Sequence, residues 1–270
     1  MTTSRDDHGV HEATPPVLTV EGAVATVRLN RPRHLNRIEP EDLTALDGIL
    51  AGLAHDPAIR VLVLTGTGRA FCSGYHLGDI GARQEAGSER ETGPDRVAFE
   101  AVADRLEDLA VPTICRLNGG VYGGAMDLAL ACDFRVGIET AELVMPAARL
   151  GLHYYPSGLQ RFVSRIGADA TKRLFLTAQG IPAAEMLRIG YLTDLVPADA
   201  LDARVAALAA TLAGNAPRAV AGMKATINAI ARGSLDREAA SARHRESMTG
   251  EEIKEGLHAF REKRPPVFTP

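Results

Sequence analysis

The spacing of apolar residues changes along the chain and predicts strands and helices in turn. In residues 17–30, "VLTVEGAVATVRLN", apolar and polar residues alternate on both sides of Glu21 and Gly22, which predicts a β-hairpin. Residues 40–53 open with a proline and two acidic residues and then carry apolar residues at helical spacing, which predicts a helix. Residues 61–68, "VLVLTGTG", are apolar up to a glycine-containing end, as is typical of a buried strand.

The alternation of predicted strands and helices continues through the middle of the chain and is followed by an almost entirely helical pattern. Polar, glycine-containing residues 81–94 predict a mobile loop. Further on, the pattern predicts a helix and three strands, over residues 96–109, 112–117, 134–139 and 141–146. From Ser157 onward the pattern is almost entirely helical. The sequence therefore predicts an α/β core followed by a helical C-terminal part.

Length and composition fit one globular domain with a sizeable core. The chain has 270 residues, of which 46% are hydrophobic, and a net charge of −4. It has no basic run and few aromatic residues, so we expect no nucleic-acid partner. No apolar run approaches the roughly 20 residues of a membrane span, so we expect no membrane association. We divide the chain into a core, residues 17–200, and a helical region, residues 201–270.

The N-terminal end and the cysteines bear on location. Residues 1–16 are polar, end in Pro-Pro and lack the apolar centre of a signal peptide, so we expect a disordered tail. The three cysteines, Cys72, Cys115 and Cys132, show no CxxC spacing. An odd number without that spacing fits a reducing compartment and argues against a disulfide framework or a structural zinc site. We therefore expect a cytoplasmic protein without a metal.

Two glycine turns are candidates for binding an anion. In "NGGVYGGAMDLALACD", Gly124 stands at the predicted start of a helix, where backbone N–H groups are unpaired and glycine allows close approach. Asp127 follows on the same face of the first turn. In "GRAFCSGYHLGDI", Ser73 and Gly74 form a second turn that presents the Tyr75 N–H. Two N–H donors from separate turns are what a thioester oxyanion requires, although each turn alone also fits an ordinary loop.

With these turns, two further segments carry a family resemblance: "VRLNRPRHLN" early in the chain and "EGLHAFREKRPP" near its end. Over about residues 17–270 the chain resembles the crotonase (enoyl-CoA hydratase/isomerase) superfamily. The resemblance implies a spiral of ββα units, a C-terminal helical trimerisation region and an acyl-CoA thioester substrate. It implies that the N–H groups of Tyr75 and Gly124 hold the thioester oxygen. It implies no cofactor beyond the CoA moiety of the substrate.

One expected carboxylate is missing. Hydratases of this superfamily typically use two glutamates, and the positions that match them here hold Asp127 and Ala147. Hydration needs one group to activate water and another to handle the proton next to the thioester. An alanine can do neither, so either Asp127 works alone or the reaction differs from ordinary hydration.

The stretch "LGLHYYPSGLQ" resembles methylmalonyl-CoA decarboxylases of the superfamily. Those enzymes also lack the second glutamate and carry a tyrosine three residues after a Leu-Gly-type turn, a position that Tyr154 occupies after Gly151. They place a histidine where this chain has Tyr75, and here the histidine is shifted to His76. We therefore take Tyr154 and His76 as candidate pocket residues, with packing as the alternative for Tyr154 and for its neighbour Tyr155.

Further residues are candidates for holding CoA and for assembly. By resemblance, CoA would contact residues of three segments, namely Arg31, Arg33, Ser73, Gly74, Leu77 and Lys263. For Lys263 the alternative is a solvated basic helix end, which also suits the helix dipole. The apolar stripes after residue 201 indicate helices that pack on other helices. By resemblance the partner is a second copy, which gives a homotrimer or a dimer of trimers.

The residues leave several functions open. The first interpretation is a decarboxylase-like acyl-CoA lyase of the malonyl- or methylmalonyl-CoA type, which stabilises a thioester enolate. The second is an enoyl-CoA hydratase or double-bond isomerase with Asp127 as its sole acid and base. A thioester hydrolase or ring-cleaving relative is a third. A CoA-binding paralogue without chemistry belongs to a different class, and the intact glycine turns count against it.

Overall fold

The computed structural model describes residues 14–85 and 97–269, and for residues 83–85 it describes the backbone only. Most of the predicted disordered tail, residues 1–13, lies outside the described residues. So do residues 86–94 of the predicted mobile loop. The first part of that loop prediction is wrong, because residues 81–85 belong to helix α2 (Leu77–Glu85).

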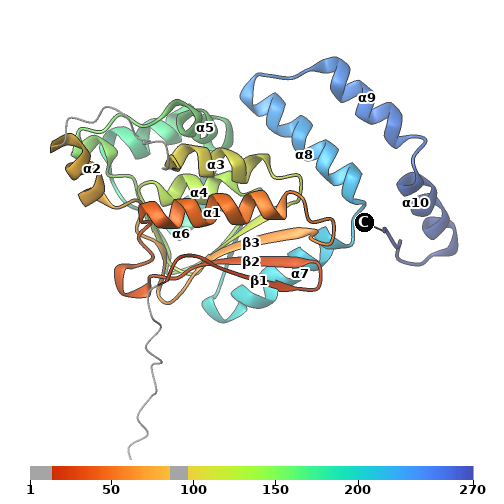
Figure 1. Ribbon diagram of the computed structural model, residues 1–270, viewed down its shortest axis with the longest axis horizontal. Helices are drawn as coiled ribbons and strands as arrows, with labels where there is room; N and C mark the ends of the chain where they lie inside the picture. Colours follow the sequence, from red (N-terminus) through yellow and green to blue (C-terminus); the bar gives the residue numbers. More distant parts are fainter. Residues whose placement is uncertain (1–13, 86–96, 270) are drawn as a thin grey trace, which may run out of the picture.

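A six-stranded sheet forms the centre of the core (Figure 1). Its strand order is β1-β2-β3-β5-β7-β10, and all neighbours are parallel except the hairpin of β1 and β2. The strands are β1 (Val17–Glu21), β2 (Val24–Leu29), β3 (Val61–Gly66), β5 (Thr113–Leu117), β7 (Phe134–Ile138) and β10 (Asp194–Val196). The predicted hairpin is confirmed, since Glu21 pairs with Val24 across the turn. Every residue of β3 is buried, as its apolar run predicts.

A second sheet of short strands packs beside the first. Its order is β4-β6-β8-β9, and its strands are β4 (Ala70–Cys72), β6 (Gly120–Tyr122), β8 (Glu142–Val144) and β9 (Ile181–Pro182). Strands β9 and β10 interrupt the part after Ser157, which was predicted to be almost entirely helical. They have two and three residues, too few to show a period of two in the sequence. Thr193 holds β10 against β7, because its N–H and its hydroxyl both donate to the Arg135 carbonyl, at 2.9 and 3.0 Å.

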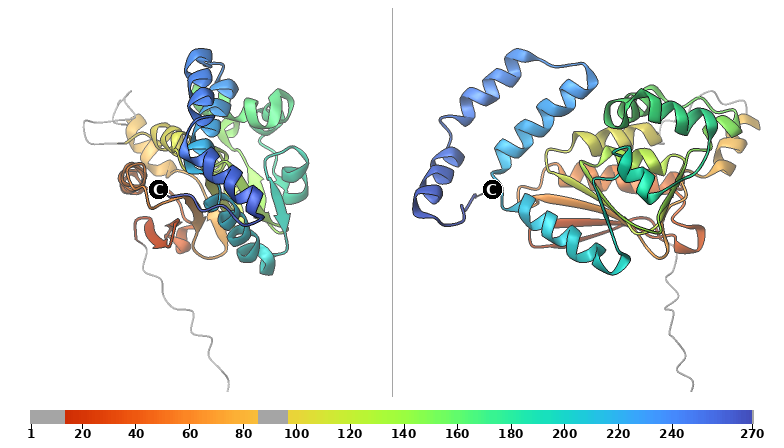
Figure 2. Two further views of the ribbon diagram at one scale, coloured as in Figure 1. Left: turned by 90° about the vertical axis from the view of Figure 1, so that its right-hand side faces the viewer. Right: turned by 180° about the vertical axis from the view of Figure 1, so that it is seen from behind.

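Helices cover both faces of the large sheet. On one side lie α1 (Pro40–Leu53), α3 (Phe99–Asp108) and α4 (Ala125–Ala131), and on the other lies α7 (Leu201–Ala213), which contacts β3, β5 and β7 (Figures 1 and 2). Helix α1 has the predicted bounds, and a capping box between Glu39 and Asp42 closes its N-terminus. All seven residues of α4 are buried, so α4 is the central helix of the core.

The C-terminal helices form an arm that extends from the core (Figures 1 and 2). The arm consists of α8 (Pro217–Arg232), α9 (Arg237–Ser247) and α10 (Glu251–Glu262), and α8 contacts α3 and α5 (Pro156–Thr177). A short helix, α6 (Ala183–Arg188), connects β9 to the turn before β10. Among the helices that the structure describes, none combines the length and apolarity needed to cross a membrane.

Candidate active site

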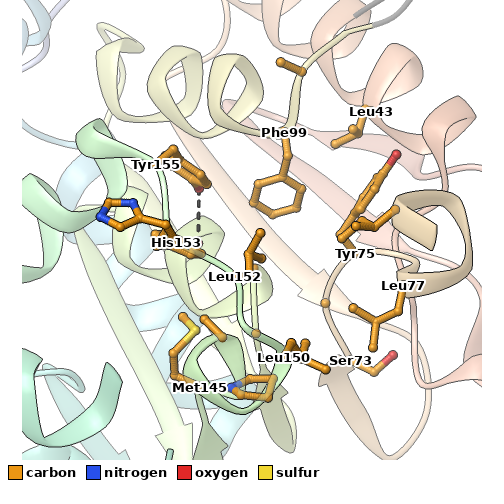
Figure 3. Close-up of a pocket in the computed structure, with 18 of the residues that line it drawn as sticks. Leu43, Ser73, Tyr75, Leu77, Phe99, Met145, Leu150, Leu152, His153 and Tyr155 are labelled. Atoms are coloured by element: carbon orange, nitrogen blue, oxygen red, sulfur yellow. Dashed lines mark hydrogen bonds between the residues drawn. The ribbon is translucent and has the colours of Figure 1, made fainter. Parts of the chain in front are cut away.

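One apolar cavity of about 350 Å³ lies where four parts of the core meet (Figure 3). Most of its walls come from the turn after β4, the start of α3, the turn between β6 and α4, and residues 145–156 ahead of α5, and helices α1 and α2 add Leu43, Leu77 and Ile80. Leucine, valine, isoleucine, methionine and aromatic side chains dominate these walls. A concave, mostly apolar pocket of this size with a few polar groups is typical of small-molecule sites.

The two glycine turns of the sequence are in contact at this cavity. Gly74 has a φ of 91°, and a Cβ built on it would lie 2.7 Å from the Tyr122 carbonyl oxygen and 3.4 Å from the Gly124 nitrogen. Only glycine therefore fits there without a shift of backbone. Gly124 is the N-cap of α4, a position whose N–H finds no partner within the helix.

Neighbouring contacts hold both turns in place. The Ile38 N–H donates to the Gly74 carbonyl at 2.9 Å, and the His76 N–H donates to the Ile38 carbonyl at 3.0 Å. These bonds fix the backbone on both sides of Tyr75, whose hydroxyl donates to Asp79 at 2.6 Å. On the cavity side, the Phe99 ring covers Gly124, since a Cβ on Gly124 would lie 3.0 Å from that ring. Figure 3 shows Phe99 between Tyr75 and Tyr155.

The carboxylate of Asp127 does not reach the cavity wall. It is fully buried and accepts hydrogen bonds from the Tyr155 hydroxyl and from Arg161 Nη1, the latter at 2.5 Å. Its other oxygen, Oδ1, has no partner among the described residues. Burial raises the pKa of Asp127 above its ordinary range, against the opposing charge of Arg161.

Both tyrosines of the stretch "LHYYPSG" line the cavity. Their rings stack with centroids 4.3 Å apart, and the Tyr154 hydroxyl donates to the Tyr155 hydroxyl at 3.2 Å. Burial raises the pKa of both hydroxyls well above the ordinary tyrosine value, so both stay protonated at neutral pH. Ala147 also lines the cavity, and no aspartate or glutamate does so among the residues that the structure describes.

The structure brings some predicted site residues together and separates others. The cavity is lined by Ser73, Gly74, Tyr75, Leu77, Gly124 and Tyr154. Outside it, His76 Nδ1 lies 2.7 Å from Glu39 Oε2, and Arg31 forms ion pairs with Glu41 and with Asp42. Arg33 and Lys263 are exposed, and Lys263 lies at the end of α10 on the arm. The roles that the resemblance gives to these residues stay predictions.

Two residues near the site, Phe99 and Arg161, were not predicted from the sequence, and Tyr155 was considered there only beside Tyr154. Phe99 follows a segment read as a loop, so nothing marked it as a wall residue. Tyr155 has a twin in Tyr154, and spacing alone cannot say which hydroxyl meets Asp127. Arg161 did leave a signal, because it falls on the same face of α5 as the buried Gly158 and Phe162. A charged side chain on a buried helix face needs a buried partner.

The fold and site define a class: an α/β protein whose apolar cavity ends at two touching glycine turns. The sequence model of the enoyl-CoA hydratase/isomerase family matches residues 19–270. The chain belongs to this family, the crotonase superfamily, whose members process acyl-CoA. The resemblance drawn from the sequence motifs is thereby confirmed, as is the α/β fold.

Individual relatives match over almost the whole chain. The short-chain-enoyl-CoA hydratase of Clostridium acetobutylicum is 32% identical over 92% of this chain and 95% of its own length. The carnitinyl-CoA dehydratase of Proteus mirabilis is 30% identical over 93% of this chain and 97% of its own length. Among solved structures, an enoyl-CoA hydratase from Bacillus anthracis is similar with a TM-score of 0.81, at 28% identity, over 94% of this chain and 99% of that chain.

Proposed function

We propose that this protein forms an acyl-CoA thioester enolate in its cavity and acts as an enoyl-CoA hydratase or double-bond isomerase. The observation that carries the proposal is the contact between the Gly74 turn and the N-terminus of α4 at the cavity. The N–H groups of Tyr75 and Gly124 would hold the thioester oxygen there. Negative charge that develops on this oxygen is stabilised by donors fixed in advance, which is often the largest single contribution to catalysis.

The apolar lining of the cavity is a second reason to expect an acyl substrate. Its walls are apolar on all sides of the glycine turns, with Leu150, Leu152 and Phe99 among them (Figure 3). An acyl chain buries apolar surface in such a pocket, while the thioester carbonyl would meet the backbone donors of the glycine turns. The hydratase names of the relatives favour hydration or isomerisation over other enolate chemistry.

A second candidate is decarboxylation of a malonyl-type thioester, the first interpretation of the sequence. It is favoured by one observation: no carboxylate of the described residues lines the cavity, and Ala147 lies there instead. Loss of CO₂ needs no base to remove a proton, and a neutral wall accepts the carboxylate of such a substrate without charge repulsion.

The two candidates differ in their products. The protein is incubated with crotonyl-CoA, 3-hexenoyl-CoA, malonyl-CoA and methylmalonyl-CoA. The thioesters are then separated by chromatography, which resolves double-bond isomers of equal mass, and their masses are measured by mass spectrometry. We expect crotonyl-CoA to gain one water or the hexenoyl double bond to migrate. Loss of CO₂ from either malonyl thioester would instead support the decarboxylase. Release of free CoA would indicate a hydrolase, and four unchanged thioesters would indicate a CoA-binding paralogue.

The proposal includes assembly into a homotrimer or a dimer of trimers. The arm carries exposed apolar side chains on two helices, including Ile227, Met223 and Phe260, which are 63, 57 and 81% exposed. Apolar patches of this kind mark protein contacts, and a second copy of the chain is the partner that the family resemblance implies. Native mass spectrometry should give three or six chains of 28.7 kDa. A monomer at micromolar concentration would contradict this part of the proposal.

A further inference from the structure

The cavity meets the buried polar network of the core at one side chain, Tyr155. Tyr155 lines the cavity, and its hydroxyl donates to Asp127, which lies behind it. A glycine inside helix α5 makes this placement feasible. A Cβ on Gly158 would lie 2.5 Å from the Tyr154 ring and 2.6 Å from the Tyr155 ring, so any other residue would displace both tyrosines.

Arg161, on α5, ties Asp127 to two other helices, α5 and α3. The guanidinium of Arg161 is 2.5 Å from Asp127 on α4, and it also pairs with Asp104 at 2.6 Å and Glu107 at 3.2 Å on α3. Only 2% of the Arg161 side chain is exposed. Buried ion pairs of this kind hold a carboxylate in one orientation, and here that orientation aims Oδ2 at the Tyr155 hydroxyl.

The carboxylate that accepts the Tyr155 hydrogen bond lies in the same helical turn as the glycine that would hold the thioester. Asp127 belongs to the first turn of α4, and its N–H donates to the Gly124 carbonyl at 2.9 Å. The Phe99 ring lies next to both Gly124 and Tyr155. It covers Gly124, and its centroid is 6.4 Å from the centroid of the Tyr155 ring. A thioester oxygen bound at the Gly124 N–H would leave its neighbouring carbon within the cavity that Tyr155 also lines.

We propose that Tyr155 is the catalytic residue that moves a proton to and from the carbon next to the thioester, with Asp127 and Arg161 as positioning residues behind it. This inference rests on the proposed function. In the forward step the C–H bond breaks and a new O–H bond forms on Tyr155, while the original phenol proton passes to Asp127 Oδ2. The electron pair of the C–H bond moves to the thioester oxygen between Tyr75 and Gly124. The reverse step returns a proton to carbon, and no further reactant is needed.

The electrostatics suit a proton path of this kind. Burial raises the pKa of Asp127, which makes its carboxylate a stronger base than an exposed aspartate. Burial and the nearby Asp127 charge raise the pKa of Tyr155 well above its ordinary value, so a free phenolate is disfavoured. The phenol must therefore pass its proton to Asp127 in the same step in which it accepts the proton from carbon. In the forward step one negative charge moves from Asp127 to the thioester oxygen. Arg161 stays charged throughout, because its carboxylate partners Asp127 and Glu107 raise its pKa against the effect of burial.

The test follows deuterium exchange at the carbon next to the thioester of butyryl-CoA in deuterium oxide. This substrate can be neither hydrated nor decarboxylated, so the readout reports proton transfer alone. Tyr155→Phe keeps the ring and removes the hydroxyl, and exchange should fall about 100-fold or more. Tyr122→Phe is the matched control, because the Tyr122 hydroxyl also donates to a carboxylate, Glu142 at 2.6 Å, outside the cavity. Its exchange should stay within about threefold of wild type.

Asp127→Asn tests whether Asp127 acts through Tyr155. The amide cannot accept the phenol proton, so exchange should fall as far as in Tyr155→Phe, and the double variant should lose no more than either single one. Melting temperature and the affinity for butyryl-CoA show whether each variant is folded and binds. Losses that multiply in the double variant, or full exchange in folded Tyr155→Phe, would overturn the inference. Absence of exchange in the wild type would instead contradict the proposed function.

Discussion

Replacing Gly74 by alanine should separate the two glycine turns and reduce activity more than any ordinary glycine substitution. The φ of 91° at Gly74 is unfavourable for a side chain, a strain of about 1–2 kcal/mol. The new Cβ would lie 2.7 Å from the Tyr122 carbonyl, and relieving such overpacking costs about 1–3 kcal/mol. Together, we expect the free energy of unfolding to fall by roughly 2–5 kcal/mol.

Activity should fall as well, because the backbone can relieve the contact only by moving Tyr75 away from Gly124. Loss of one oxyanion donor costs about 3 kcal/mol, or roughly 100-fold in rate. Urea unfolding measures the stability, and deuterium exchange at butyryl-CoA measures the activity, at a temperature where both variants are folded.

Gly22→Ala is the matched control. Gly22 also has a positive φ, +59°, but a Cβ there would meet nothing within 4 Å. It should lose about 1–2 kcal/mol of stability from backbone strain and keep full activity. If Gly74→Ala matched Gly22→Ala in both stability and exchange, the contact between the turns would have no role in catalysis.

Three further predictions concern the cavity. Tyr154→Phe removes only the hydroxyl that donates to Tyr155 at 3.2 Å, so turnover should fall about fivefold with little change in melting temperature; unchanged turnover would leave Tyr154 as packing. Ala147→Glu adds a carboxylate to the cavity wall, so calorimetry should show about tenfold or more weakening for malonyl-CoA relative to crotonyl-CoA; equal weakening would indicate a steric effect only. Exchange requires ionised Asp127, whose pKa is raised above 3.8, so the rate should fall on acidification earlier than for an ordinary aspartate; a pH–rate profile without an acid limb would contradict this.

Much of the core was predictable because its signals are long or chemically specific. Helix α1 has fourteen residues with apolar side chains at helical spacing, and its predicted bounds match the structure. The six buried residues of β3 form one apolar run. The glycine turns were predictable because Gly74 and Gly124 stand where a backbone must approach closely, and the structure shows these two turns in contact.

The rest of the site depends on three-dimensional contacts that spacing does not encode. The position of Asp127 on the first turn of α4 was predicted, but the direction of its side chain is set by Arg161, which is 34 residues away in sequence. Gly158 leaves room for the rings of both Tyr154 and Tyr155, and only the contact with Asp127 on α4 distinguishes the Tyr155 hydroxyl. Strand β10 was missed because its three residues are ordered by Thr193 and by β7, not by a pattern of their own.

The most direct test of thioester enolate formation is the infrared spectrum of a bound thioester. Butyryl-CoA labelled with carbon-13 at the thioester carbonyl is bound to the wild-type protein, and the isotope difference spectrum gives the carbonyl stretch alone. Two N–H donors, from Tyr75 and Gly124, should polarise the carbonyl and lower its stretching frequency below that in water. In Gly74→Ala this shift should shrink. A frequency equal to or above that in water, with butyryl-CoA bound, would contradict an oxyanion site in this cavity.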